Sequence, residues 1–331
     1  MALKISIGAD PELFLKKDGR FISAHDILPG TKHEPHAVDK GAVQVDGVAA
    51  EFNILPAYTA REFSSYNAQV MKQLRDMAPG CELVLDPVAV FEESYFHKLP
   101  DNVRELGCNP DFNAYTGQVN KKPDSTGCMR TAAGHIHIGW GKDFDPSDPI
   151  HFEDCRVVAR QMDFYLGAYS LQWDNDDRRR KMYGAAGSFR PKPYGVEYRP
   201  LSNTWLKSAR LQEWIFNAAY QGVHRLINDG QCLEDKLGDV ARKVIDGNEA
   251  WWTDRKHKLY GLNQYTGLMN PPAIEVCPPI IKMDDKPSPI KRKAKHMYGE
   301  TVNGLTTFDT GITAGAWQTL NSNQLVNPTQ S

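Results

Sequence analysis

Polar side chains that could bind a cation recur in pairs at four places far apart in the chain. The members of each pair stand two residues apart and alternate with apolar residues, and the pairs are Asp10 and Glu12, Glu51 and Asn53, His135 and His137, and Glu197 and Arg199. Residues two apart on a β-strand share one face. Each pair is therefore predicted to lie on the polar side of a strand whose other side is apolar.

A single sheet that holds all four strands would gather these carboxylate, imidazole and guanidinium groups on one face. Several carboxylates held together at neutral pH need divalent cations, because otherwise their pKa values rise and they take up protons. Oxygen-rich ligand sets favour Mg²⁺ or Mn²⁺ over Zn²⁺. The alternative for any one pair is a solvated face, and for Glu197 and Arg199 it is an intra-strand ion pair, which contributes little when exposed.

Basic residues precede the fourth pair. The run Asp177–Lys181 leads into a glycine-rich segment, residues 183–194, that carries Arg190 and Lys192. Such a segment suits an anion site, because its backbone and guanidinium group can approach a phosphate. It is not a Walker loop, since no Gly-Lys-Ser or Gly-Lys-Thr follows. The alternative is a solvated helix end. Magnesium beside arginine and a glycine-rich loop is the usual equipment for holding a nucleoside triphosphate.

A polar loop over residues 28–36 contains Lys32, His33 and His36, and His25 lies just before it. The spacing of these histidines matches no zinc pattern, so metal binding here is weakly indicated. A loop that brings Lys32 to a phosphate is the other interpretation.

Strand and helix signals define the elements that must position these residues. Strand one runs to about Leu15 and turns back at residues 17–20, and a second polar strand region covers residues 43–55. Asp46 has the opposite parity to Glu51, and a turn or bulge at Gly47 could reset the register. Amphipathic helices are predicted over residues 59–77, 149–173 and 204–227, with helical signal continuing to about Ile245. The predicted class is α+β, with a curved, mainly antiparallel sheet of about six strands, a concave polar face, and helices on the other face.

Composition narrows the class of protein. The chain has 331 residues, 41% hydrophobic and 24% charged, with a net charge of -2. It therefore suits a globular protein and gives no general electrostatic case for nucleic-acid or membrane binding. The six cysteines form no CxxC pair, and no signal peptide or membrane span is indicated, so we expect reduced thiols in the cytoplasm. We expect one catalytic domain over residues 1–285 and a basic, then polar extension over 286–331, either flexible or used for interaction.

The four pairs also carry a family resemblance. The chain resembles the carboxylate–amine ligase superfamily related to glutamine synthetase and glutamate–cysteine ligase, and most of all the phage and bacterial group called COOH-NH2 ligase type 2, or amidoligase type 2. The matching motifs span roughly residues 5–210, and they are Gly8-Ala9-Asp10-Pro11-Glu12, Asp46 with Glu51-Phe52-Asn53-Ile54-Leu55-Pro56, His135-Ile136-His137-Ile138-Gly139, and Glu197-Tyr198-Arg199. The departures are the aspartate at position 10, the short gap between Asp46 and Glu51, and the unmatched tail.

The resemblance implies an ATP- and Mg²⁺-dependent ligase that forms an amide through an acyl phosphate, with Mn²⁺ as an alternative metal. The implied metal ligands are Asp10, Glu12, Glu51, His135 and Glu197. Phosphate would be held by Arg190, Arg199, Lys192 and Lys32, and Arg190 and Arg199 would act on the transferring group. Asp46 is either a metal ligand or a carboxylate that orients the amine. Substrate contacts are expected from Arg130, His137, Asn53 and Asp111.

Two other functions stay open at this point. One is a phosphotransferase of the guanidino or amine kinase kind, which would stop at a phosphorylated product. The other is a phage structural or binding protein that keeps the fold without turnover. For the ligase, the substrates would be a small-molecule or peptide carboxylate and an amine, with a modified nucleobase as the one nucleic-acid case. Homo-oligomers are compatible with the sequence, and a phage-encoded protein would act in the host cytoplasm.

Overall fold

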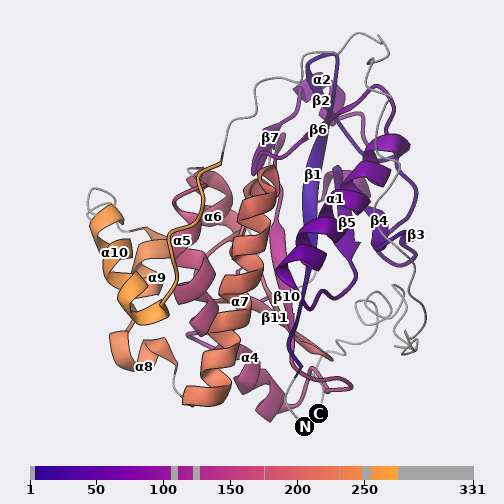
Figure 1. Ribbon diagram of the computed structural model, residues 1–331. Helices are drawn as coiled ribbons and strands as arrows, with labels where there is room; N and C mark the ends of the chain where they lie inside the picture. The colour runs from indigo at the N-terminus through magenta and orange to yellow at the C-terminus, as the bar shows by residue number, and fades with distance from the viewer. Residues whose placement is uncertain are drawn as a thin grey trace, which may run out of the picture.

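The computed structural model describes residues 4–105, 111–121, 127–174, 176–230, 232–247 and 255–274 (Figure 1). The predicted extension over 286–331 lies outside these residues, as do Cys108 and Cys277. Within the described part of the chain, no helix is long and apolar enough to cross a membrane.

Ten strands form one sheet, in the order β3-β4-β5-β1-β10-β12-β11-β8, and β2 and β6 also pair with β1. The strands of this sheet are β1 (Ser6–Lys17), β2 (Arg20–Ile22), β3 (His36–Val38), β4 (Gly41–Asp46), β5 (Ala49–Ile54), β6 (Glu82–Val84), β8 (Phe112–Asn113), β10 (Gly134–Gly139), β11 (Ser188–Lys192) and β12 (Gly195–Tyr198). The predicted count of about six strands is wrong, because strands of two or three residues are too short to show alternation. A separate pair, β7 (Val88–Val90) and β9 (Met129–Thr131), forms a two-stranded sheet.

All pairings between these strands are antiparallel, as predicted. The predicted hairpin after β1 is confirmed: Asp18 and Gly19 both have positive φ, which the tightest hairpin turns require, and Lys17 pairs with Arg20. A second two-residue turn, Gly47–Val48, joins β4 to β5 and pairs Asp46 with Ala49. Gly47 has a φ of 58°, which favours glycine.

Helices lie on both sides of the sheet: the long ones cover its apolar face, and two short ones, at residues 93–96 and 101–104, belong to a smaller core on the other face. They are α1 (Ala60–Met77), α2 (Glu93–Phe96), α3 (Asp101–Arg104), α4 (Pro149–Met162), α5 (Ala168–Ser170), α6 (Asp177–Tyr183), α7 (Ala209–Asp229), α8 (Leu233–Leu237), α9 (Val240–Asp246) and α10 (Arg255–Thr266). Two shorter helical segments are a π-helix, Asp163–Gly167, between α4 and α5, and a 3₁₀-helix, Asn203–Lys207, before α7. The helix predicted over residues 59–77 is α1, and a capping box starts it, because Thr59 and Glu62 exchange side chain–backbone hydrogen bonds.

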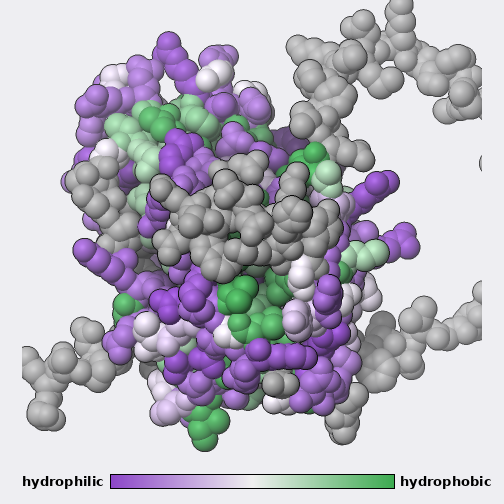
Figure 2. Space-filling model, turned by 90° about the vertical axis from the view of Figure 1, so that its left-hand side faces the viewer, coloured by the Kyte–Doolittle hydropathy of each residue, from purple (hydrophilic) through white to green (hydrophobic). Residues whose placement is uncertain are grey.

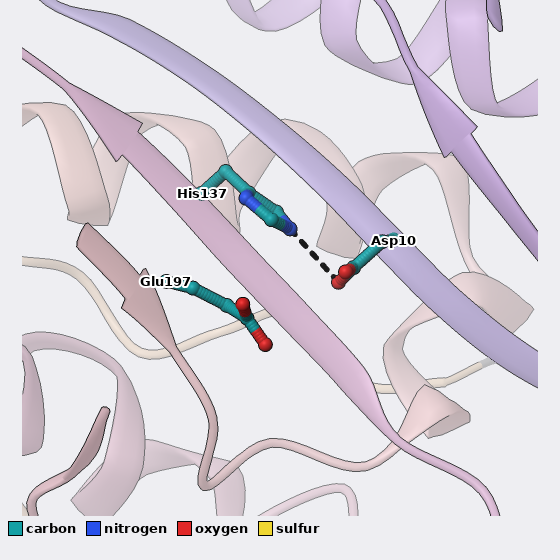
Figure 3. A group of neighbouring side chains, drawn as sticks. All are labelled: Asp10, His137 and Glu197. Atoms are coloured by element: carbon teal, nitrogen blue, oxygen red, sulfur yellow. Dashed lines mark ion pairs between the residues drawn. The ribbon is translucent and has the colours of Figure 1, made fainter. Parts of the chain in front are cut away.

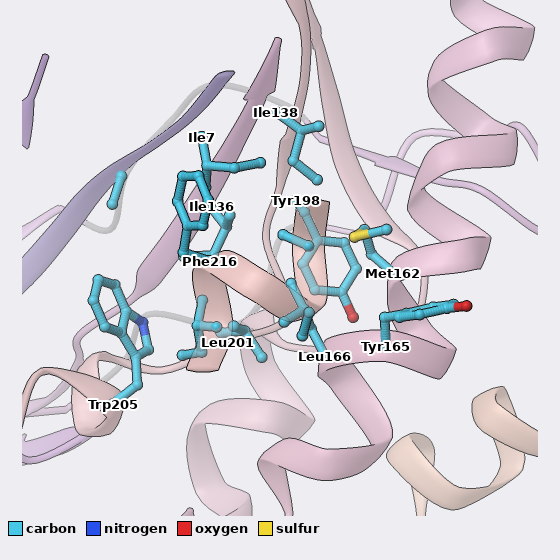
Figure 4. Close-up of a cluster of buried hydrophobic side chains, with 14 of the residues drawn as sticks. Ile7, Ile136, Ile138, Met162, Tyr165, Leu166, Tyr198, Leu201, Trp205 and Phe216 are labelled. Carbon is cyan, nitrogen blue, oxygen red and sulfur yellow. The ribbon is translucent and has the colours of Figure 1, made fainter. Parts of the chain in front are cut away.

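The helices α1 and α7 pack against each other and on β1, β4 and β5, and α4 packs on β11 and β12 (Figure 1). Between the layers lies the main core, where strand residues such as Ile7, Ile136, Ile138 and Tyr198 meet helix residues such as Met162, Leu166 and Phe216 (Figure 4). Seen from the side of α8, α9 and α10, the surface is mainly polar, with small apolar areas (Figure 2).

A second, smaller core lies on the polar side of the sheet. Phe14 has the same parity on β1 as Asp10 and Glu12, and it packs with Phe91, Phe96 and other buried apolar residues. On β1 the polar part of this face therefore ends at Glu12, because the next residue on the same side, Phe14, belongs to the smaller core.

Candidate active site

The four polar pairs lie on adjacent strands of one sheet and on one face of it. In the register, Asp10 is opposite His135 and Glu12 is opposite Glu51. His137 is opposite Glu197, which in turn is opposite Arg190 on β11. Their apolar neighbours on the same strands point into the main core. The sheet thus brings together residues separated by up to about 190 positions, as the alternation in the sequence indicates.

Three side chains on β1, β10 and β12 form a group that could hold a metal ion. Asp10, His137 and Glu197 are buried, and one potential ligand atom from each lies within 4.8 Å of the other two. Figure 3 shows the three side chains converging from neighbouring strands. The Nε2 atom of His137 is 2.9 Å from Asp10 Oδ1. An imidazole and two carboxylates are a donor set that divalent cations accept.

His135 lies between the two acids of this group. Its Nδ1 atom is 3.2 Å from Asp10 Oδ1 and 3.4 Å from Glu197 Oε1. Burial and the nearby guanidinium of Arg199 lower the pKa of His135 to about 4. Burial would raise the pKa of Asp10, but the two histidines hold it below its ordinary value. At neutral pH the ionised carboxylate of Asp10 therefore lies beside the neutral imidazole of His135, and both can donate electron pairs to a cation.

Glu197 is fully buried, and three cationic side chains surround its carboxylate. Lys192 Nζ is 2.8 Å from Oε2, Arg190 Nη1 is 3.2 Å from Oε2, and Arg199 Nη1 contacts Oε1. Burial alone would raise the pKa of Glu197, but these three groups hold it well below its usual range. Arg199 also donates through Nε to Asp111 Oδ2 at 3.1 Å. Three of the four cations predicted to hold phosphate are thus gathered at one point of the face, and the fourth, Lys32, is not among them.

A second acidic group, on β1, β4 and β5, has no such cations. Glu12 Oε2 accepts a hydrogen bond from the backbone N–H of Ala133 at 2.8 Å, and Glu51 Oε2 accepts one from Gln44 Nε2 at 2.6 Å. Within the described residues, no lysine or arginine lies within ion-pair distance of Glu12 or Glu51. Burial, and then the charge of Asp46, raise the pKa of Glu12 to about 7 and that of Glu51 well above its ordinary value. This part of the face is short of positive charge.

Asp46 joins this second group because of the turn at Gly47–Val48. Asp46 is opposite Ala49 in the register, so it shares a face with Glu51 although their positions differ in parity. The same register places Gln44 opposite Glu51. Gln44 was not among the predicted site residues, although Gln44 and Asp46 are two residues apart and therefore share a face of β4.

Two other predicted residues, Lys32 and Asn53, lie near Glu51. Lys32 is half-buried, and its charge lies close enough to Glu51 to lower the pKa of that carboxyl. Asn53 lies on β5 with the same parity as Glu51, opposite Ala42. The roles assigned to these two side chains stay predictions.

Arg130 is held by the backbone around it. Its Nη1 atom donates to the carbonyl oxygens of Met129 and Gly127 at 2.7 and 2.9 Å, and its guanidinium lies 4.4 Å from the centre of the Phe96 ring. In this conformation its donors bind backbone carbonyl groups at the start of β9 and at the end of α3. Its predicted contact with the substrate carboxylate stays a prediction.

The basic run on α6 divides into exposed and buried members. Arg178 pairs with Asp176 and Lys181 with Asp177, as in a solvated helix end. Arg179, in contrast, is buried, and its guanidinium donates to the carbonyl oxygens of Arg199 and Pro200 at 3.1 and 2.8 Å. Burial lowers the pKa of Arg179 to about 10. Arg180 is buried as well. The sequence could not distinguish these two from Arg178, since nothing in a run of three arginines says which of them turn inward.

The glycine-rich segment forms β11 and the turn before it. The Ala186 N–H donates to Asp246 Oδ1 at 2.7 Å, so this group is already bonded to a carboxylate. The contribution of this segment to the polar face comes from Arg190 and Lys192.

The fold and the site define a protein with an acid-rich face on an antiparallel sheet, and three side chains of this face could hold a metal ion. Residues 131–256 match the family described as "Phage phiEco32-like COOH.NH2 ligase-type 2". The match includes the strands of His135, His137 and Glu197, and it confirms the resemblance that the motifs indicate. It supports an enzyme of the carboxylate–amine ligase kind.

Two further comparisons add little. No curated protein matches the chain. Among solved structures, a chain titled "GmaS/ADP complex-Conformation 1" is similar, with a TM-score of 0.33 and 10% sequence identity over 81% of this chain and 71% of that chain. A likeness at that level carries no argument about fold or function.

Proposed function

We propose that the protein is an ATP- and Mg²⁺-dependent ligase that joins a carboxylate to an amine through an acyl phosphate. The observation that carries the proposal is the division of the polar face into two parts. One part gathers Arg190, Lys192 and Arg199, which suit phosphate. The adjoining part gathers the carboxylates of Glu12 and Glu51, which have no lysine or arginine within ion-pair distance among the described residues, and this suits divalent cations. The family match supports the same class.

The side chains present fit magnesium or manganese. The proposed ligands are Asp10, Glu12, Glu51, His135 and Glu197, and the geometry adds His137, which the sequence analysis assigned to the substrate. Carboxylate oxygens predominate in this set. Glu12 and Glu51 accept hydrogen bonds from the neutral donors Ala133 N–H and Gln44, which cannot balance a negative charge as a cation would. When bound, the metal would supply positive charge to the phosphate oxygens of ATP.

In the first half of the proposed reaction, an oxygen of the substrate carboxylate attacks the γ-phosphorus of ATP. The bond from that phosphorus to the β-γ bridging oxygen breaks, and ADP leaves. Arg199 and Arg190 bind the oxygens of the γ-phosphoryl group, and Lys192 and Lys32 hold the other phosphates. The phosphate is needed because an amine cannot expel oxide from a free carboxylate.

In the second half, the amine attacks the acyl carbon and inorganic phosphate leaves with the acyl oxygen. The product is an amide, and the amine loses one proton. Asp46 orients the amine through its carboxylate, and Asn53, Asp111 and Arg130 contribute to substrate selection. Asp111 is already bonded to Arg199, so substrate contacts at Asp111 would act directly on the phosphate-binding arginine.

The test is an assay of ADP formation from ATP with Mg²⁺, run across pools of carboxylates and amines. We expect turnover that requires both a carboxylate and an amine, and a product that mass spectrometry shows to be lighter than their sum by one water. A phosphotransferase would instead give a phosphorylated product with only one substrate.

Two variants make this assay specific. Glu51→Gln should lose turnover, because it removes one carboxylate from the group that lacks cations. Lys72→Gln, which breaks only the exposed ion pair with Asp76 on α1, should keep it. Full turnover in Glu51→Gln, or none in the unaltered protein with any pool, would contradict the proposal.

A further inference from the structure

A buried carboxylate that the proposed reaction does not use lies on the core side of the sheet. Asp163 begins the π-helix between α4 and α5 and is fully buried. Both of its oxygens accept hydrogen bonds from tyrosines: Oδ1 from the Tyr198 hydroxyl at 2.7 Å and Oδ2 from the Tyr115 hydroxyl at 2.6 Å. Wide turns of this kind within helices are often found at functional sites.

Each of the two tyrosines connects Asp163 to Arg199 through a different part of the chain. Tyr198 is the chain neighbour of Arg199, and alternation along the strand sends their side chains to opposite faces of the sheet. Tyr115 belongs to the segment 111–121, which carries Asp111, the carboxylate that accepts from Arg199 Nε at 3.1 Å. One carboxylate thus fixes both the strand that bears the arginine and the segment that bears its acidic partner.

The surroundings hold this arrangement in place. The Ala114 N–H donates to the Gly187 carbonyl at 2.8 Å, which anchors the 111–121 segment beside the start of β11. Gly167, one turn after Asp163, lies against the Tyr198 hydroxyl, and a Cβ at that position would collide with it. The lack of a side chain at Gly167 therefore leaves room for the Tyr198 hydroxyl to bond to Asp163.

We infer that Asp163 is a positioning residue for Arg199: through Tyr198 and Tyr115 it fixes the arginine and Asp111 relative to each other, and so orients the guanidinium toward the γ-phosphoryl group of ATP. The inference rests on the proposed function, because it assumes that Arg199 binds this phosphate. If the Tyr115 bond is lost, the segment that carries Asp111 loosens and the guanidinium loses one of its two acidic anchors.

The test compares nucleotide binding in Tyr115→Phe, Tyr198→Phe and Asp163→Asn. Binding is measured by calorimetry with Mg²⁺ and either ADP or a non-hydrolysable ATP analogue. A buried hydrogen bond contributes about 1 kcal/mol, so we expect about fivefold weaker binding of the ATP analogue in Tyr115→Phe. Binding of ADP should stay unchanged, because ADP has no γ-phosphate. Combining Tyr115→Phe with Asp163→Asn should add nothing to the effect of Asp163→Asn alone.

The matched control is Tyr169→Phe. Tyr169 is also a buried tyrosine of this helical region, but its hydroxyl bonds to Asn263 and Thr266 on α10, away from Arg199. Tyr169→Phe should lose about as much stability as Tyr115→Phe, with no change in the ratio of ATP-analogue to ADP affinity. If Asp163→Asn does not fold, the two phenylalanine variants of Tyr115 and Tyr198 decide the question.

A second readout does not depend on nucleotide binding. The Nε–H of Arg199, assigned by NMR through its loss in Arg199→Lys, should exchange slowly in the unaltered protein and faster in Tyr115→Phe, but not in Tyr169→Phe. Equal losses of ADP and ATP-analogue affinity, or no change in either affinity with an unchanged Arg199 signal, would overturn the inference. If the unaltered protein binds neither nucleotide, the proposed function fails, and the exchange rate of the Arg199 signal alone decides whether Asp163 positions it.

Discussion

Replacing Glu12 by glutamine should stabilise the metal-free protein at alkaline pH. The folded protein raises the pKa of Glu12 from 4.5 to about 7, mainly through burial and the charge of Asp46. A shift of this size corresponds to about 3 kcal/mol. Glu12 is only half-buried, so solvent screening reduces our expectation to about 2 kcal/mol. The amide oxygen of glutamine can still accept the Ala133 N–H.

The sign follows from proton binding. Below pH 4.5 the carboxyl is protonated in both the folded and the unfolded chain, so it does not change the free energy of unfolding. Between 4.5 and about 7 the folded protein keeps a proton that the unfolded chain has released, so its stability falls as the pH rises. Above about 7 the full cost of the ionised group remains. Glutamine has no such proton, so its variant should keep its stability over this range.

The assay is urea denaturation at pH 5, 6, 7 and 8 in the presence of EDTA, repeated with Mg²⁺. We expect the curves of Glu12→Gln and the unaltered protein to separate as the pH rises. Mg²⁺ at a hundred times the Kd of its site should raise the free energy of unfolding of the unaltered protein by about 2.7 kcal/mol. It should raise that of Glu12→Gln by much less. Glu213→Gln, an exposed change on α7, is the control. A variant no more stable than the unaltered protein at pH 8 without metal would refute the reasoning.

Three other changes have expected outcomes. Arg199→Lys cannot bond to Glu197 and Asp111 together, so steady-state ATP turnover should fall about a hundredfold while the fold is kept. Trp205→Ala removes a buried indole that stacks on Phe63, and urea denaturation should show a loss of about 3–5 kcal/mol. Thr59→Ala removes the cap of α1, and thermal unfolding should show a loss of about 1 kcal/mol.

Each of these changes has a result that would count against its reasoning. Turnover within threefold of the unaltered protein would show that Arg199 does not touch the transferring phosphate. A stability loss below about 1 kcal/mol for Trp205→Ala would mean that the core repacks around the missing ring. A loss for Thr59→Ala as large as that for Trp205→Ala would point to a tertiary role of Thr59 beyond the cap.

Alternation in the sequence predicted the polar face well, because a period of two leaves little choice about which side chains share a side of a strand. Asp10, Glu12, His135 and Glu197 could be placed together before their strands were ordered. The position of Asp46 could not, because parity does not carry across a turn, and only the two-residue connection at Gly47–Val48 returns it to the face of Glu51.

Other features of the structure leave no recognisable pattern in the sequence. The short strands carry too few residues to show a period, which is why the sheet was predicted too small. The region 149–173 shows helical spacing throughout, but a π-helix inside it moves Asp163 under β12 without interrupting that pattern. The difference between Arg178 and Arg179 depends on which side of a short helix meets the sheet, and tertiary packing decides that.

Three cationic side chains share the carboxylate of Glu197, and in the proposed reaction this sharing makes ligand binding an exchange of partners. A phosphate that takes up Arg190, Lys192 or Arg199 weakens their hold on Glu197 and leaves its oxygen lone pairs to a divalent ion. A divalent ion that takes up Glu197 in turn frees the cationic side chains for an anion. Each ligand thus lowers the cost of admitting the other, and thermodynamic linkage makes the benefit equal in both directions.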